Sequence, residues 1–192
     1  MKSLQVCGSS SIDHSTTKQY RILPHGQKDE ADPKVAFVSG GDNRVEFKRL
    51  SQLDPDRTIF TIDRHNNRWV FYHTYTTRYI GRDDDKIEGM NMGYTYSDLG
   101  NRGEFYIQRS TNEEATDSNP CLDKIVLTME EQKCTTMVLD VCREYNLSHF
   151  HVKKNDDKMK LVNNNRDADW FTIQEVQITG QDVDGNNIWS VV

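Results

Sequence analysis

Short runs of alternating apolar and polar residues fill the second half of this chain, and they constrain its fold more than any other feature. Each run ends at a cluster of Asn, Asp, Gly or charged residues. The runs are Leu122–Thr128, Thr135–Cys142, His149–Lys153, Met159–Val162, Trp170–Thr179 and Ile188–Val192. Alternation with a period of two is typical of strands that bury one face, and the residues between the runs favour tight turns. The sequence therefore predicts an antiparallel all-β domain.

The clearest hairpin of the first half joins Thr58–Asp63 to Arg68–Tyr75 across His65-Asn66-Asn67. In its second strand both faces carry apolar residues, since the alternation separates Trp69, Phe71, His73 and Tyr75 from Val70, Tyr72 and Thr74. Such a strand suits the middle of a sheet that is covered on both sides, or a barrel wall that faces a ligand.

Two segments have a second interpretation besides strand and turn. Met129–Val141 is the one plausible helix, but Thr135, Thr136 and Val138 favour a strand there. Asp182-Val183-Asp184-Gly185-Asn186 begins like a calcium loop but lacks the bidentate Glu that closes one. We predict a strand for the first segment and a hairpin turn for the second.

The length of 192 residues suits a single domain. Residues 1–18 are rich in Ser and Thr, so we expect a loosely ordered arm there and one all-β domain over residues 19–192. No internal repeat at a fixed period is visible. Hydrophobic residues make up only 35% of the chain, which fits long solvated loops or a barrel with a partly polar or hollow interior.

Charge and hydropathy exclude two classes of partner. The net charge of −6 argues against nucleic acid, because phosphate binding needs a basic patch. No run approaches the roughly 20 apolar residues that span a bilayer. The N-terminal residues MKSLQVCGSSS lack the apolar core of a signal peptide, so the chain is either intracellular or the mature form of a secreted protein.

The four cysteines are Cys7, Cys121, Cys134 and Cys142, and they lack CxxC spacing. They allow two disulfides in any of three pairings. An even number of cysteines in a polar β-rich chain favours secretion, where disulfides persist.

No catalytic signature is present: the chain has no G-x-S-x-G motif, phosphate-binding loop or dinucleotide fingerprint. His149 and His151 share one strand face, but no further ligand follows at a metal-site spacing, so a polar surface pair is predicted. We therefore expect a binding protein without metal or cofactor rather than an enzyme.

Aromatic residues are the remaining signal for a binding site. The candidates for the lining of an internal pocket are Trp69, Phe71, His73, Tyr75, Phe105 and Trp170. Charged neighbours such as Asp63, Arg78 and Glu104 could orient a polar group of the ligand. On this hypothesis the partner is a small hydrophobic or amphipathic molecule.

The segments Cys121–Thr128 and Lys133–Cys142 resemble the late strand pair of lipocalins, in which a V-L-x-T strand passes through a charged link to a strand ending near a Cys. Ile87-Glu88-Gly89 and Gly103–Arg109 lie where such barrels have earlier strands. The resemblance implies an up-and-down β-barrel that sequesters a small ligand. A Cys7–Cys121 bridge would be similar to that of salivary lipocalins.

The alternative architecture is a two-sheet β-sandwich or jelly roll. Alternate residues of Trp170–Gly180 supply apolar side chains to both faces, which suits a sandwich as well as a barrel. The function would then be recognition of a protein or glycan partner by loops or by an exposed sheet face. An internal cavity distinguishes the barrel from this alternative.

Overall fold

The computed structural model describes the backbone of residues 18–65, 68–83, 86–90, 102–109, 125–138, 141–162 and 169–192. The arm expected over residues 1–18 lies outside this part, apart from Lys18. The strands are β1 (Gln19–Pro24), β2 (Lys34–Val38), β3 (Val45–Arg49), β4 (Phe60–His65), β5 (Arg68–His73), β6 (Arg78–Asp83), β7 (Lys86–Met90), β8 (Phe105–Arg109), β9 (Ile125–Val138), β10 (Val141–Asn155), β11 (Lys158–Val162), β12 (Phe171–Gln181) and β13 (Asn187–Val191). Two short 3-10 helices, η1 (Leu50–Gln52) and η2 (Pro55–Thr58), precede β4.

Six strands pair in a ring, in the order β1, β4, β5, β8, β9, β12 and back to β1. Every pairing is antiparallel. Two of the six junctions are single residue pairs among the described residues: Trp69 opposite Phe105, and Phe171 opposite Ile125. The ring is therefore not a continuously hydrogen-bonded barrel wall.

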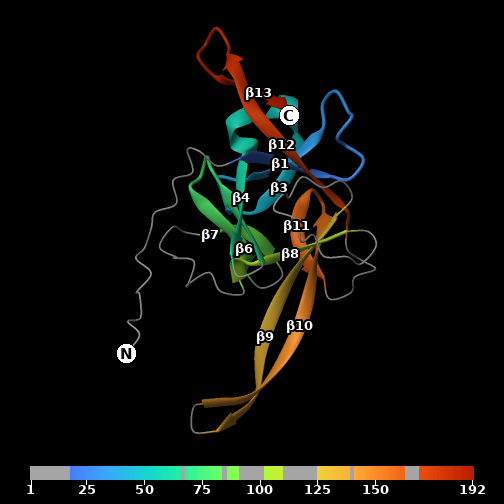
Figure 1. The fold of residues 1–192 in the computed structure, drawn as a ribbon, viewed down its shortest axis with the longest axis vertical. Helices are drawn as coiled ribbons and strands as arrows, with labels where there is room; N and C mark the ends of the chain where they lie inside the picture. The colour runs from blue at the N-terminus through green and yellow to red at the C-terminus, as the bar shows by residue number, and fades with distance from the viewer. Residues whose placement is uncertain are drawn as a thin grey trace, which may run out of the picture.

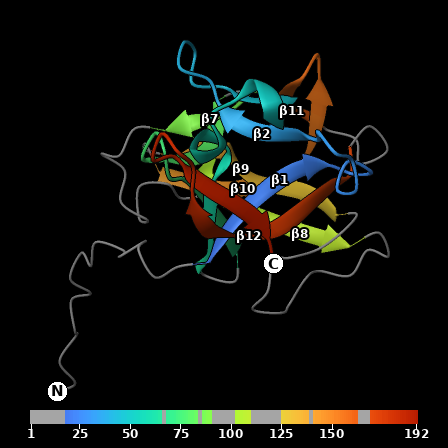
Figure 2. The same ribbon diagram turned by 90° about the horizontal axis from the view of Figure 1, so that it is seen from above.

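Three hairpins connect the ring strands: β2–β3, β6–β7 and β10–β11. They also contact one another, since β11 pairs with both β3 and β7, and Arg44 forms a bridge with Glu88. The same unit of ring strand, hairpin and ring strand thus occurs three times along the chain (Figures 1 and 2). A six-strand ring capped by three hairpins is the arrangement of a β-trefoil.

One apolar core lies between the ring and the hairpins. Each ring strand contributes two alternate residues, as the period of two requires. These are Tyr20 and Ile22, Phe60 and Ile62, Trp69 and Phe71, Phe105 and Ile107, Leu127 and Met129, and Phe171 and Ile173. The hairpins add Ala36, Val38, Val45, Phe47, Ile80, Ile87, Met159 and Leu161.

The antiparallel all-β prediction is confirmed, and the expected up-and-down strand order is wrong. An up-and-down barrel pairs each strand with its neighbours in the sequence, whereas here β1 pairs with β4 and β12. The ring and the hairpins face each other across the core, so the layered alternative is nearer to the observed architecture. Trp69, Phe71 and Phe105, which were expected to line a pocket, belong to this core.

β9 and β10 form a long antiparallel ribbon that extends away from the other strands (Figure 1). We expected a break at the charged residues Glu130–Lys133, but β9 continues through them. Two strands that satisfy each other's backbone hydrogen bonds do not need apolar side chains to stay extended. The same pairing confirms that Met129–Val138 is a strand and not a helix.

The cysteines are only partly covered by the described residues. Cys7 and Cys121 lie outside them, while the backbone register places Cys134 opposite Tyr145 and Cys142 opposite Met137 in the ribbon. The predicted disulfides stay a prediction.

Candidate functional site

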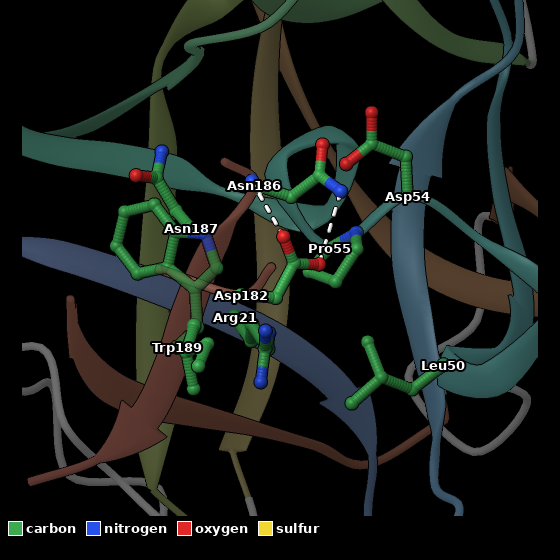
Figure 3. A pocket seen from close by; sticks show the side chains of 9 residues that line it. Arg21, Leu50, Asp54, Pro55, Asp182, Asn186, Asn187 and Trp189 are labelled. Carbon is green, nitrogen blue, oxygen red and sulfur yellow. Dashed lines mark hydrogen bonds between the residues drawn. The ribbon is translucent and has the colours of Figure 1, made fainter. Parts of the chain in front are cut away.

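A hollow of about 520 Å³ lies between the η1–η2 connection and the ribbon formed by β12 and β13 (Figure 3). We call it the Trp189 hollow. Its lining consists of Arg21, Leu50, Asp54, Pro55, Asp182, Asn186, Asn187, Ile188 and Trp189. The size lies within the range of small-molecule sites, which are roughly 300–1,000 Å³. The lining combines an indole with amide, carboxylate and guanidinium groups.

The wall formed by η2 is held by Asp54 at its N-terminus. The Asp54 carboxylate accepts a hydrogen bond of 3.0 Å from the backbone N–H of Asp56, and Pro55 occupies the first helical position. Asp at the N-cap and Pro at the next residue are favoured in helices because they suit the unpaired N–H groups there. The local sequence Asp54-Pro55-Asp56 therefore fixes this wall.

The opposite wall depends on the turn between β12 and β13. The Asp182 carboxylate accepts hydrogen bonds from the backbone N–H groups of Asp184 and Asn186, both at 2.9 Å, and from the Asn186 amide at 3.0 Å. These hydrogen bonds lower the pKa of Asp182, with the Asn186 side chain as the largest cause. Gly185 has a φ of 84°, a conformation that glycine adopts without strain. The predicted hairpin turn is confirmed.

Asp56 connects the two walls. The Trp189 indole N–H donates to the Asp56 carboxylate at 2.5 Å, and the Asn187 amide donates to the same carboxylate at 3.2 and 3.4 Å. These contacts join residues more than a hundred positions apart in the sequence. Asp56 therefore orients both the indole ring and the amide of the hollow.

Arg21 belongs to β1 and lines the same hollow. Its neighbours Tyr20 and Ile22 face the core, so Arg21 lies on the other face of the strand. Only 5% of its surface is exposed. Its Nε–H donates to the Thr58 hydroxyl at 3.0 Å, and that hydroxyl donates to the Pro55 carbonyl at 2.7 Å. Burial lowers the pKa of Arg21.

A second hollow, of about 250 Å³, lies beside the first and shares Asn187 and Trp189 with it. The rest of its lining is Gln19, Asp56, Ile59, Thr74, Tyr75 and Ile178. Tyr75 and Ile178 are large and exposed, at 54% and 49%. Trp189 thus lines both hollows, and the second also exposes the side chains of Tyr75 and Ile178.

Most of the predicted ligand-binding residues lie elsewhere. Trp69, Phe71 and Phe105 belong to the core, where the Phe71 and Phe105 rings meet edge to face at 5.0 Å. Their packing against one another accounts for their burial. Trp170 is half-buried, and its carbonyl accepts from the His25 N–H at 2.9 Å. A ligand-binding role for these residues stays a prediction.

Two further predicted residues contact the η2 region. Tyr75 lines the second hollow, and the Arg57 guanidinium lies 5.4 Å from its ring centre. His73 is fully buried, with Nε2 at 2.7 Å from the Arg57 carbonyl and Nδ1 at 2.7 Å from the Thr76 hydroxyl. Burial is the largest cause that lowers the pKa of His73, to about 4. His73 therefore contacts η2 through the backbone carbonyl of Arg57.

Arg21, Asp56 and Trp189 were not predicted as site residues. Arg21 did carry a signal, since it is a charged residue inside the apolar strand Tyr20–Leu23. Asp56 and Trp189 carried none, because their hydrogen bond joins distant segments. Of the charged residues expected near a ligand, Arg78 lines a separate hollow of about 230 Å³ next to β6 and β7.

The described residues contain no group of three or more His, Cys, Asp or Glu side chains that could hold a metal ion. No helix in the same part of the chain has the length and hydrophobicity of a membrane span.

Comparisons with known proteins show similarity of fold alone. No protein family and no curated protein matches the sequence. Among solved structures, a GlcNAcα1-4Gal-releasing endo-β-galactosidase from Clostridium perfringens matches over 83% of this chain with a TM-score of 0.53 and 9% identity. Cry35Ab1 matches over 87% with a TM-score of 0.48 and 14% identity. The chain corresponds to 33% and 38% of the lengths of these two proteins.

Proposed function

We propose that this chain is a recognition module that binds a glycan in the Trp189 hollow. The observation that carries the proposal is the lining of the hollow, where an indole ring is fixed next to amide, carboxylate and guanidinium groups. The candidate pocket inside a barrel has no comparable support, because Trp69, Phe71 and Phe105, three of the residues assigned to it, pack in the core.

The chemistry of a sugar ring matches this set of side chains. One face of many pyranose rings carries C–H groups that pack on an aromatic ring, while the hydroxyls at the rim both donate and accept hydrogen bonds. Trp189 would supply the aromatic surface, with its orientation fixed by Asp56. Asp54 supplies an acceptor, Arg21 supplies donors, and Asn186 supplies both.

The comparison with the endo-β-galactosidase is compatible with this proposal. Its name describes an enzyme that acts on a glycan, and the matched part is 33% of its length. At 9% identity no residue is carried from that protein to this one. The activity of the whole neighbour is therefore not proposed for this chain.

Binding to an array of glycans tests the proposal. We expect the wild-type chain to bind a subset of glycans, and Trp189→Ala to weaken that binding by at least about tenfold, as for a central aromatic anchor. Tyr75→Ala is the matched control, because Tyr75 lies in the neighbouring hollow only. Equal binding by the wild type and Trp189→Ala, or no binding to any glycan, would refute the proposal.

Recognition of a protein is the second candidate function. It is favoured by large apolar side chains on the β12–β13 ribbon, where Ile178, Ile188 and Val191 are 49%, 45% and 54% exposed. The Ile178→Ser variant distinguishes glycan recognition from protein recognition, since Ile178 does not line the Trp189 hollow. Loss of partner binding by Ile178→Ser with unchanged glycan binding would support a protein partner.

We also propose that the protein is secreted, because it has an even number of cysteines and disulfides persist outside the cell. Native mass spectrometry of protein from a eukaryotic host, before and after reduction, measures the number of disulfides. We expect two. Four free thiols would contradict secretion.

A further inference from the structure

We infer that the ligand of the Trp189 hollow carries an oxyanion, as in a carboxylated or sulfated sugar, and that this group pairs with the guanidinium of Arg21. The inference rests on the proposed glycan-binding function and adds a chemical class to it. Its basis is the buried guanidinium of Arg21, which lines the hollow and forms no ion pair among the described residues.

Arg21 has few partners for a buried charged group. Within the described part of the chain, the hydrogen bond from Nε to the Thr58 hydroxyl is the side-chain hydrogen bond that Arg21 forms. Burial alone lowers the pKa of Arg21, with no contribution from a charged neighbour. An ionised group in such a place is costly unless another charge compensates it.

The direction of the free donors follows from the hydrogen bond to Thr58. That bond fixes the Nε edge of the guanidinium against η2, while the side chain lines the hollow (Figure 3). An Arg fork presents parallel N–H groups that suit the two oxygens of a carboxylate or sulfate. A ligand oxyanion could therefore occupy the position of the missing partner.

Two carboxylates of the hollow oppose an anion, so their state matters. Asp182 already accepts three hydrogen bonds from the turn that it closes. Asp54 accepts one from Asp56 N–H, at the end of the hollow formed by η2. These neutral N–H donors hold the carboxylates in place but leave them negatively charged. An oxyanion is therefore favoured in the hollow only where it pairs directly with the Arg21 guanidinium.

The test is a titration followed by NMR, with the indole N–H signal of Trp189 as the reporter. The chain has three Trp residues, and Trp189→Phe identifies the relevant signal. The probes are methyl β-glucoside, methyl β-glucuronide and glucose 6-sulfate. The first two share one ring and differ only in whether carbon 6 is an alcohol or a carboxylate.

We expect the glucuronide or the sulfate to bind about tenfold more tightly than the glucoside at low salt, as one charge-assisted interaction predicts. This preference should shrink as salt is added. A planar carboxylate and a tetrahedral sulfate are distinguished by which probe binds more tightly. Arg21→Gln should remove the preference for the anionic sugars over the glucoside, and Arg21→Lys should keep only part of that preference.

Three results would overturn the inference. Equal affinity for the glucoside and both anionic probes would leave glycan binding intact and refute the role of the oxyanion. A preference that persists in Arg21→Gln would assign the oxyanion to another group. No response to any of the three sugars would also refute it, and the glycan array then decides the proposed function separately. If Arg21→Gln does not fold, the salt dependence of the wild type still tests the preference.

Discussion

Asp56 is the single residue on which the geometry of the hollow depends most, because its carboxylate holds both Trp189 and Asn187. We predict that Asp56→Ala lowers the free energy of unfolding by about 1–2 kcal/mol, since hydrogen bonds to a charged group on a partly exposed site are lost. It should also shift the Trp189 indole signal. Urea denaturation and NMR measure the two effects, with the exposed Asp29→Ala as control. An unchanged indole signal would contradict the role of Asp56.

His73 makes the stability of the fold depend on pH. Its pKa is about 4 in the folded protein, against about 6.5 in an unfolded chain, so the unfolded state binds the proton more strongly. Stability should be unaffected above pH 6.5 and should fall as the pH drops from 6.5 towards 4, by up to about 3 kcal/mol. Denaturation at several pH values measures this slope. A His73→Gln variant that keeps the full slope would refute the assignment, and His25→Gln is the exposed control.

Among the elements, the β12–β13 ribbon carries most of the hollow, and its turn depends on Gly185. We predict that Gly185→Val loosens the ribbon, because a branched residue is strained at a φ of 84°. The cost should be about 1–2 kcal/mol, with faster amide hydrogen exchange in β13. Gly180→Ala is the matched control, since an added Cβ there meets Ile188 at an ordinary 3.9 Å. Equal exchange in both variants would contradict the prediction.

The elements also show which structural features were visible in the sequence. The alternation of Trp69, Phe71 and their neighbours predicted a strand covered on both faces, and the β4–β5 hairpin is where it was expected. The pairing of β1 with β4 and β12 was not visible, since alternation marks a strand but does not choose its partner. Arg21 was not predicted as a site residue for the same reason: its environment comes from η2 and the ribbon, which are distant in the sequence.

At the scale of the whole molecule, a structural unit occurs three times although the sequence shows no repeat. Each ring strand needs only two inward apolar residues, such as Tyr20 and Ile22 in β1 or Trp69 and Phe71 in β5. Residues of different size and shape satisfy this requirement equally well if the total volume is kept. The structural repeat therefore leaves no fixed pattern of identical residues.

The same core supports a prediction about stability. Phe171 is fully buried and packs near Phe47 of the β2–β3 hairpin, with ring centres 6.0 Å apart. Phe171→Ala should cost about 3–5 kcal/mol of stability by leaving a cavity between the ring and a hairpin. Trp189→Ala, outside the core, should cost clearly less. Thermal or urea denaturation compares them, and similar losses would mean that the core is not where the fold is stabilised.

We propose that this β-trefoil recognises a glycan at the Trp189 hollow and not inside the ring. The most direct test is a map of backbone amide NMR shifts on addition of the best-binding glycan from the array. We predict that the shifts concentrate at residues 50–58, at 182–189 and around Arg21. Shifts concentrated on the core strands around Trp69 and Phe105, with none at Trp189, would contradict this proposal. They would support ligand binding in the internal pocket that the sequence predicted.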